Sequence, residues 1–289
     1  MLDAVVVGAG PAGVAAALQL RRVDVDFLVF EAGEVGGLVR NARLVENYPA
    51  FPRGVRGGAL AAALREQLSA AEIEVRRLRV RRVWPDDRGW RLETEDGAAE
   101  ACRFVIAATG TRPRPLEVAG AAEAAAAGRL VYHVADLASP PERIVVVGGG
   151  EVAFDYAINL AERGCATTIL VRGRVRAPAR LVRLAIERGV EVATAAPVDG
   201  IALRGGRVSV ATPSGDFEVD MVVAAVGRGP ADDSIRHLGS LRVDAWGESR
   251  HPGLFACGSL VRPVELRHVA VAVGDGVRAA TAVCGRLGR

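Results

Sequence analysis

Two glycine-rich segments with the spacing of nucleotide-binding loops lie 140 residues apart in this chain, at Gly8–Gly13 and Gly148–Ala153. The first has the pattern G-x-G-x-x-G and the second G-x-G-x-x-A. Glycines at this spacing permit a tight turn and let backbone N–H groups approach a pyrophosphate. Each segment follows a short apolar run typical of a buried strand and precedes a stretch typical of a helix. The two loops therefore predict two dinucleotide sites.

The first site is predicted more strongly because a second apolar run, 25–30, ends in an acid, Glu31. This acid stands 18 residues past Gly13, where a carboxylate accepts hydrogen bonds from an adenosine ribose. A glycine pattern alone can mark only a tight turn, but strand, helix, second strand and acid occur here in order. The loop residues expected to contact the nucleotide are Gly8, Gly10, Pro11, Ala12 and Gly13.

The second site differs from the first in the residues that follow its second apolar run, 167–171. Arginines stand there, and no acid. Arg172, Arg174 and Arg176 offer guanidinium groups that bind a 2′-phosphate in bidentate fashion, whereas a carboxylate would repel it. This contrast favours FAD at the first site and NADPH at the second; the alternative is that the arginines form only a solvated loop. The residues expected at the second site are Gly148, Gly150, Glu151, Val152, Ala153, Arg172 and Arg176.

The composition indicates a well-packed globular protein with room for two domains: 289 residues, 50% hydrophobic and 25% charged. The net charge of +3 comes from 37 basic and 34 acidic residues, a balance that argues against binding to nucleic acid or to an anionic membrane. All the basic residues are arginine, which excludes Schiff-base lysine chemistry and a lysine-bearing phosphate loop.

The sequence also indicates a cytoplasmic setting. The apolar N-terminus lacks a basic leader, and no run of about 20 apolar residues exists to span a bilayer. The four cysteines are far apart and form no C-x-x-C, so neither a metal site nor a disulfide scaffold is expected. They are Cys102, Cys165, Cys257 and Cys284.

The order of apolar runs and helical stretches predicts an α/β fold with two Rossmann-like, three-layer ββα nucleotide-binding domains, the second inserted into the first. Residues 1–113 and 231–289 are expected to form a discontinuous FAD-binding domain, and residues 116–228 the NAD(P)H-binding domain. A β-meander is expected over 74–94, with strands at 74–83 and 90–94 joined by a turn at 85–89. Proline- and glycine-rich stretches mark linkers at 111–115 and 227–230.

These motifs resemble those of the low-molecular-weight thioredoxin reductases and the thioredoxin-reductase-like ferredoxin–NADP reductases. The most specific of them is V-E-N-Y-P at 45–49, because generic Rossmann proteins have no reason to carry it. The others occur in family order over nearly the whole chain, at residues 8–13, 30–31, 36–37, 51–52, 107–110, 148–153, 225–228, 252–256 and 274–276.

The resemblance implies roles for further residues at the flavin. Asn47 would contact the flavin or its ribityl chain, the backbone near Val80 would meet the adenine, and Thr109 would line the passage between the domains. Arg267 and His268 would lie beside the pyrimidine ring, where a helix N-terminus stabilises negative charge. His268 is thus the candidate catalytic residue, although it could be an ordinary helix-start residue. The remaining implied FAD contacts are Gly37, Leu38, Gly110, Gly258, Ser259 and Val269.

Three departures from the family pattern bear on function. Thioredoxin reductases carry C-x-x-C shortly before the second loop, whereas residues 130–137 here contain no cysteine. Serine replaces the family's aspartate at position 259, which would remove a charge beside the ribityl chain. The aromatic tail that covers the flavin in the ferredoxin–NADP reductases has no counterpart before Arg289. A homodimer is implied by the resemblance alone.

The function expected from these observations is an FAD-dependent NAD(P)H oxidoreductase that passes electrons from NADPH, or from NADH, to an external acceptor, either a protein or a small molecule. One alternative is a flavin-dependent oxidase or pathway enzyme that does not use NAD(P)H. Another is a non-catalytic nucleotide-binding partner subunit. A redox role for Cys257, or an acid–base set of Tyr132, His133 and Asp136, is a weaker possibility, because a lone cysteine usually packs as a small apolar residue.

Overall fold

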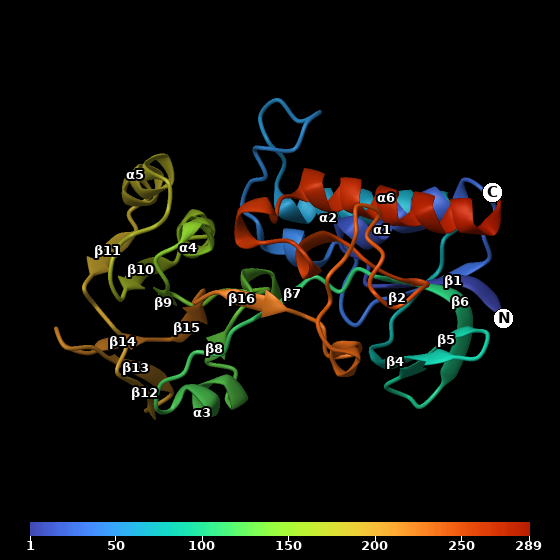
Figure 1. The fold of residues 1–289 in the computed structure, drawn as a ribbon. Coiled ribbons are helices and arrows are strands. Elements are labelled where there is room, and N and C mark those ends of the chain that lie inside the picture. The colour runs from blue at the N-terminus through green and yellow to red at the C-terminus, as the bar shows by residue number, and fades with distance from the viewer. The chain divides into compact units, whose positions relative to one another are not determined.

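The structure, a computed structural model, describes residues 1–289 and divides into two compact units. The first comprises Met1–Arg40, Val45–Arg112 and Pro230–Arg289, and the second comprises Asn41–Leu44 and Pro113–Gly229. Both units are α/β, with a parallel sheet and helices, so the predicted fold class is confirmed (Figure 1). A short two-stranded sheet pairs β7 (Thr111–Pro113) with β16 (Arg228–Pro230).

The first unit has one seven-stranded sheet in the order β3-β2-β1-β6-β5-β4, with β17 paired to β6. Strands β1, β2, β3, β6 and β17 pair in parallel, and β4 and β5 extend the sheet as an antiparallel meander. The strands are β1 (Leu2–Val7), β2 (Phe27–Phe30), β3 (Val75–Arg76), β4 (Val80–Asp86), β5 (Gly89–Thr94), β6 (Ala99–Ala107) and β17 (Leu254–Ala256). The helices are α1 (Pro11–Arg21), α2 (Gly57–Ala70) and α6 (Val269–Leu287).

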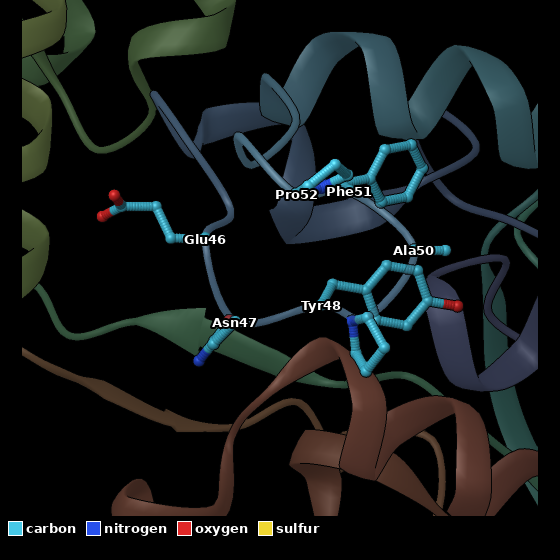
Figure 2. Close-up of a pocket in the computed structure, with 7 residues that line it drawn as sticks. Glu46, Asn47, Tyr48, Ala50, Phe51 and Pro52 are labelled. Atoms are coloured by element: carbon cyan, nitrogen blue, oxygen red, sulfur yellow. The ribbon is translucent and has the colours of Figure 1, made fainter.

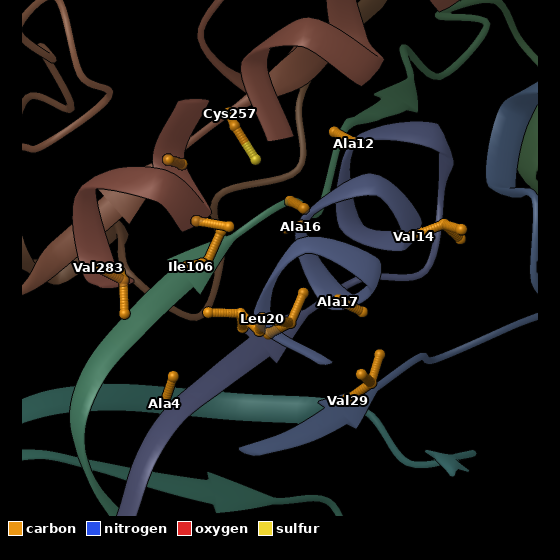
Figure 3. Packing of buried hydrophobic residues seen from close by; sticks show 14 of the residues in the cluster. Ala4, Ala12, Val14, Ala16, Ala17, Leu20, Val29, Ile106, Cys257 and Val283 are labelled. Carbon is orange, nitrogen blue, oxygen red and sulfur yellow. The ribbon is translucent and has the colours of Figure 1, made fainter. Parts of the chain in front are cut away.

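Side chains of β1 alternate between two apolar layers, as a strand buried on both faces requires. Ala4 and Val6 pack in the cluster that holds α1, α2 and α6, whereas Val5 and Val7 pack with residues of the β4–β5 meander. Figure 3 shows the helical layer, with Ile106 of β6 lying beneath α1 and α6. The first unit therefore has helices packed on one face of its sheet, while residues of the β4–β5 extension of the same sheet contribute to the apolar cluster on the other face.

The meander differs from the prediction at its start. The expected strand 74–83 is broken, because Leu78 N–H donates to the carbonyl of Arg76 in a tight turn. The chain on either side of this turn joins different partners: β3 pairs with β2 and β4 pairs with β5. The expected turn at 85–89 is also shorter, since β4 continues through Pro85 to Asp86, at the edge of the sheet where proline is tolerated.

The second unit has a five-stranded parallel sheet in the order β11-β10-β9-β15-β8. A separate three-stranded antiparallel sheet, β12-β13-β14, packs against it through a shared apolar cluster. The parallel strands are β8 (Leu130–Val131), β9 (Arg143–Val147), β10 (Ala166–Val171), β11 (Glu191–Thr194) and β15 (Met221–Ala224). The other elements are β12 (Gly200–Arg204), β13 (Arg207–Ala211), β14 (Phe217–Val219), α3 (Ala121–Ala126), α4 (Glu151–Glu162) and α5 (Ala179–Glu187).

Four residues expected in the first domain, Asn41–Leu44, pack instead with the second unit. The backbone N–H of Arg43 donates to Asp155 Oδ2 at 2.8 Å, and its guanidinium lies 3.5 Å from Glu162. Asn41 Oδ1 accepts a hydrogen bond from the N–H of Ala135 at 3.0 Å. Burial raises the pKa of Asp155 to about 6, although the hydrogen bond from Arg43 opposes this rise.

Helices α1 and α6 approach closely because glycine stands at their crossing. A β-carbon built onto Gly276 would overlap the carbonyl oxygen of Ala12, and one built onto Gly258 would lie 2.8 Å from the β-carbon of Ala12. Ala12 is part of the first glycine-rich loop. The crossing therefore places the second turn of α6 directly against that loop.

Replacing Gly276 by alanine is expected to lower the free energy of unfolding by about 1–3 kcal/mol, because the added methyl group must push against backbone. Gly274 is the matched control, since a β-carbon there meets no atom within 4 Å. Gly274→Ala is expected to be neutral or stabilising by up to about 1 kcal/mol through helix propensity. Chemical denaturation of both variants measures the difference, and equal midpoints would refute the proposed role of the crossing.

None of the helices combines the length and the apolar character that crossing a bilayer would require.

Candidate functional site

The first glycine-rich loop leaves β1 in a conformation that only glycine tolerates well. Gly8 has φ +106°, and a β-carbon there would lie 2.5 Å from the carbonyl oxygen of Ala108. A β-carbon at Gly13 would overlap the carbonyl oxygen of Gly8, whereas one at Gly10 meets nothing within 4 Å. Gly10 is the N-cap of α1 and Pro11 its first residue, and no side chain caps the helix. The first turn of α1 thus keeps N–H donors for an anion.

Glu31 lies where the sequence predicted it, at the end of β2, and it has a second role. Its Oε2 accepts the N–H of Ala9 at 2.6 Å and its Oε1 accepts the N–H of Gly33 at 2.8 Å. A carboxylate has about four acceptor positions, so two bonds leave capacity for ribose hydroxyls. Glu31 therefore braces the loop through its carboxylate and still has acceptor positions available.

Other predicted residues gather around the same loop. A β-carbon at Gly37 would lie 3.3 Å from Gly10 Cα, and the N–H of Gly36 donates to the carbonyl of Ala9 at 2.8 Å, so the segment that leads to Leu38 covers the loop. Val80 is buried in one cluster with Val7 and Phe30, the last residues of β1 and β2. The contacts of Gly36 and Gly37 place their segment beside the first loop, whereas Val80 shares an apolar cluster with the strand residues that precede the loop and Glu31.

Thr109 and Gly110 lie two and three residues past the end of β6, and a β-carbon at Gly8 would lie 3.2 Å from Thr109 Cα. The Oγ1 atom of Thr109 is buried and has no hydrogen-bond partner. A buried hydroxyl without a partner costs about 1–3 kcal/mol, and native structures seldom leave one unexplained. A polar ligand that lies along the carboxyl ends of β1 and β6 would supply the partner.

Asn47 and His268 are 221 residues apart in the chain and meet in the structure, with Asn47 Nδ2 lying 3.2 Å from His268 Nδ1. His268 is the N-cap of α6, so Val269 begins the helix as expected. Figure 2 shows the loop that carries Asn47, where Tyr48 and Phe51 stack with ring centroids 6.0 Å apart. A shallow hollow of about 550 Å³, open to solvent, lies along this loop.

A buried charge cluster beside Gly258 was not anticipated from the sequence. Asp275, on α6, accepts both Nε and Nη2 of Arg262, at 2.7 and 2.6 Å, and Nη2 of Arg278 at 2.8 Å. It also accepts the N–H of Gly258 at 3.3 Å, and Arg267 Nε donates to the carbonyl of Arg262 at 3.1 Å. The signal in the sequence was an acid between two glycines, Gly274 and Gly276, with an arginine three residues later at Arg278.

The second glycine-rich loop repeats the geometry of the first after β9. Gly148 has φ +152°, and a β-carbon there would lie 2.5 Å from the carbonyl oxygen of Ala225, at the end of β15. Gly150 is the N-cap of α4, and a β-carbon on it would meet nothing within 4 Å. Ala153 is fully buried, while Glu151 and Val152 are exposed at the start of the helix.

The arginines after β10 lie beside this loop. The N–H of Arg176 donates to the carbonyl of Gly149 at 2.7 Å, which folds the segment back over the glycines. Arg172, Arg174 and Arg176 are all exposed. Their guanidinium groups are thus available to an anionic ligand held at the second loop.

The three residues considered as an acid–base set separate into two groups. The hydroxyl of Tyr132 accepts the N–H of Leu116 at 3.1 Å. His133 Nδ1 instead lies 3.5 Å from Asp136 Oδ2, and its Nε2 lies 3.2 Å from Nη1 of Arg228.

All four cysteines are free and buried, and burial raises the pKa of each thiol, to about 12 for Cys102 and Cys257. Figure 3 shows Cys257 in the apolar layer near Ala12 and Ala16. Because the thiolate is the reactive form, these sites favour an inert packing role. No group of three or more His, Cys, Asp or Glu side chains is placed to hold a metal ion.

Thiol titration with an aromatic disulfide reagent is expected to label none of the cysteines of the folded protein at pH 7.5 on the timescale of minutes. The four should react at once in denaturant, where burial no longer raises their pKa. A thiol of the folded protein that reacted as fast as the denatured ones would instead support a redox role, and Cys257→Ala would identify it.

Comparison with known proteins bears on both sites. Residues 2–276 match the family model described as pyridine nucleotide-disulphide oxidoreductase. The chain is 32% identical to a ferredoxin–NADP reductase of Ignicoccus hospitalis, over 95% of each protein. It is 31% identical to a thioredoxin reductase of Listeria monocytogenes, over 95% of this chain and 90% of the relative. The solved thioredoxin reductase of Lactococcus lactis superposes with a TM-score of 0.87 at 26% identity, over 99% of this chain and 98% of the other.

Proposed function

Since the chain belongs to the pyridine nucleotide-disulphide oxidoreductase family, we propose that it is an FAD-dependent NAD(P)H oxidoreductase that delivers electrons to an external acceptor. FAD is assigned to the first unit and NADPH to the second. The observation that carries this assignment is the contrast between two loops of equal geometry, one followed by Glu31 and the other by Arg172 and Arg176. A ribose diol suits the acid, and a 2′-phosphate suits the arginines.

The residues of the first unit fit FAD. The free N–H groups at the start of α1 face the diphosphate, Glu31 accepts from the ribose, and the unpartnered hydroxyl of Thr109 gains a hydrogen bond. Asn47 and His268 hold the ring end, where the N-terminus of α6 favours negative charge. Bound flavin supplies the redox chemistry, accepting a hydride from the nicotinamide and releasing electrons to the acceptor.

The acceptor is proposed to be external, ferredoxin- or flavodoxin-like or a small molecule, because the chain holds no dithiol of the C-x-x-C kind. Its relatives carry the names of both ferredoxin–NADP reductase and thioredoxin reductase. All four cysteines are buried, which favours an acceptor of the ferredoxin–NADP reductase kind over one that needs an exposed dithiol.

The test is an anaerobic titration of the purified protein, after loading with FAD, with NADPH and separately with NADH. Bleaching by NADPH, followed by reoxidation on adding ferredoxin or a quinone but not thioredoxin, is the expected result. A yellow protein that neither nicotinamide bleaches would overturn the proposal in favour of an oxidase that does not use NAD(P)H. A protein that takes up no FAD would point to a nucleotide-binding partner subunit, the alternative that Ser259 favours.

A further inference from the structure

The carboxyl edge of the five-stranded sheet in the second unit carries a polar cluster that the two glycine-rich loops do not account for. All five strands are parallel, so the segments that follow them emerge along one edge. In such sheets a dinucleotide lies outside the carboxyl ends, across the point where the strand order reverses. Here that point lies between β9 and β15, and the second loop follows β9.

The arginines fix the direction in which the dinucleotide crosses this edge. Arg172 directly follows β10, on one side of β9, so an adenosine half whose 2′-phosphate binds this arginine would lie over β10. The diphosphate would then meet the loop after β9. The nicotinamide half would extend toward β15 and β8, on the other side of β9.

The chain places His133 and Arg228 at the ends of these two strands. His133 stands two residues past the end of β8, and Arg228 four residues past the end of β15. Arg228 Nη1 lies 3.2 Å from His133 Nε2, and His133 Nδ1 lies 3.5 Å from Asp136 Oδ2. The His133 and Asp136 side chains are 30% and 55% exposed, so a ligand at this edge can reach both.

The cluster presents a donor and an acceptor on opposite sides of one ring. Arg228 and Asp136 lie at the two different nitrogens of His133, so the ring separates a cationic donor from an anionic acceptor. A guanidinium group can only donate and a carboxylate can only accept. This arrangement suits a carboxamide, whose oxygen accepts and whose NH₂ group donates, better than it suits another phosphate, which the carboxylate would repel.

We propose that His133, Asp136 and Arg228 form the subsite for the nicotinamide carboxamide, with Arg228 donating to its oxygen and Asp136 accepting from its NH₂ group. His133 is a positioning residue, which holds the two charged side chains apart. This inference rests on the proposed binding of NAD(P)H to the second unit and adds the residues that set the orientation of the nicotinamide ring.

The test compares two ligands on the full-length, FAD-loaded protein by calorimetry: NADP⁺, and adenosine 2′,5′-bisphosphate, which lacks the nicotinamide half. Arg228→Met and His133→Ala are expected to weaken NADP⁺ binding about tenfold or more, since hydrogen bonds to a charged group are lost. Both variants should bind the bisphosphate within about twofold of wild type, which also shows that the second unit is folded. Arg204→Met, an exposed arginine on β12, is the matched control and should change neither affinity.

A second comparison isolates the role of Asp136. Wild-type protein is expected to bind NADP⁺ more tightly than its 3-acetylpyridine analogue, which has no NH₂ group, and Asp136→Asn should reduce this preference at least several-fold. Equal weakening of NADP⁺ and the bisphosphate in the Arg228 and His133 variants, or an unchanged preference in Asp136→Asn, would overturn the inference alone. Wild-type protein that bound neither ligand would overturn the proposed function and the inference together.

Discussion

Replacement of Asp275 by asparagine is expected to lower the free energy of unfolding by about 3–5 kcal/mol, because it leaves two guanidinium groups beside a buried neutral amide. Only 4% of the Asp275 side chain is exposed, whereas its partners Arg262 and Arg278 are 26% and 34% exposed. Asparagine keeps an oxygen for the N–H of Gly258, so the variant isolates the charge. Urea unfolding monitored by far-UV circular dichroism measures the change.

The matched control for this prediction is Asp233→Asn, which removes an exposed carboxylate that also contacts two arginines, Arg112 and Arg236. The Asp233 side chain is 61% exposed, and surface ion pairs contribute about 0–1 kcal/mol. Equal destabilisation of the two variants would show that burial of Asp275 does not increase the contribution of its ion pairs to the free energy of unfolding. Because Asp275 also holds Gly258, we expect its variant to bind FAD more weakly as well.

Replacement of both Arg172 and Arg176 by serine is expected to weaken NADPH binding about 100-fold or more while NADH binding changes less than about threefold. Hydrogen bonds to charged groups contribute about 1.5–3 kcal/mol each. NADH has no 2′-phosphate, so its binding does not depend on these hydrogen bonds. Both side chains are exposed, so the substitutions should leave the fold intact. Dissociation constants are measured by calorimetry with NADP⁺ and NAD⁺, which differ by the same 2′-phosphate and cannot reduce the flavin.

The control for the coenzyme prediction is Arg204→Ser, since Arg204 is also exposed in the second unit but lies on the β12–β13 hairpin. This variant shows how much the loss of one positive charge elsewhere in the second unit changes the affinity for each coenzyme. Equal weakening of NADPH and NADH in the double variant would assign the arginines to the diphosphate and not to the 2′-phosphate. No change in either affinity would show that the two arginines belong to a solvated loop that does not bind the coenzyme.

The local pattern of the sequence was sufficient for most elements. The apolar runs before the two loops are strands β1 and β9, and the acid predicted at the ribose is at the end of β2. Errors arose at boundaries: β2 begins at Phe27 and not at Val25, because Val25 is buried in the turn where its N–H donates to the carbonyl of Leu20. Helix α1 begins at Pro11, before its apolar pattern starts, since proline is favoured in the first turn.

The parts that sequence reasoning missed depend on which strands become neighbours. The contact of His133 with Arg228 exists because β8 pairs with β15, and 95 residues separate the two side chains. The burial of Asp275 depends on the crossing of α1 and α6, which no pattern within either helix specifies. The meeting of Asn47 with His268 could be expected only from the family resemblance, because nothing in the local sequence links the two segments.

The packing of Asn41–Leu44 with the second unit has a consequence for anyone who wishes to exchange this module between proteins. A gene fragment that encodes only residues 113–229 would omit the hydrogen bond from Arg43 to Asp155 and the bond from Ala135 to Asn41. A fragment that keeps these contacts must therefore also include residues 41–44, either fused to it or added as a separate peptide. Chimeras designed from the two linkers alone would bring together an Arg43 and an Asp155 from different parents.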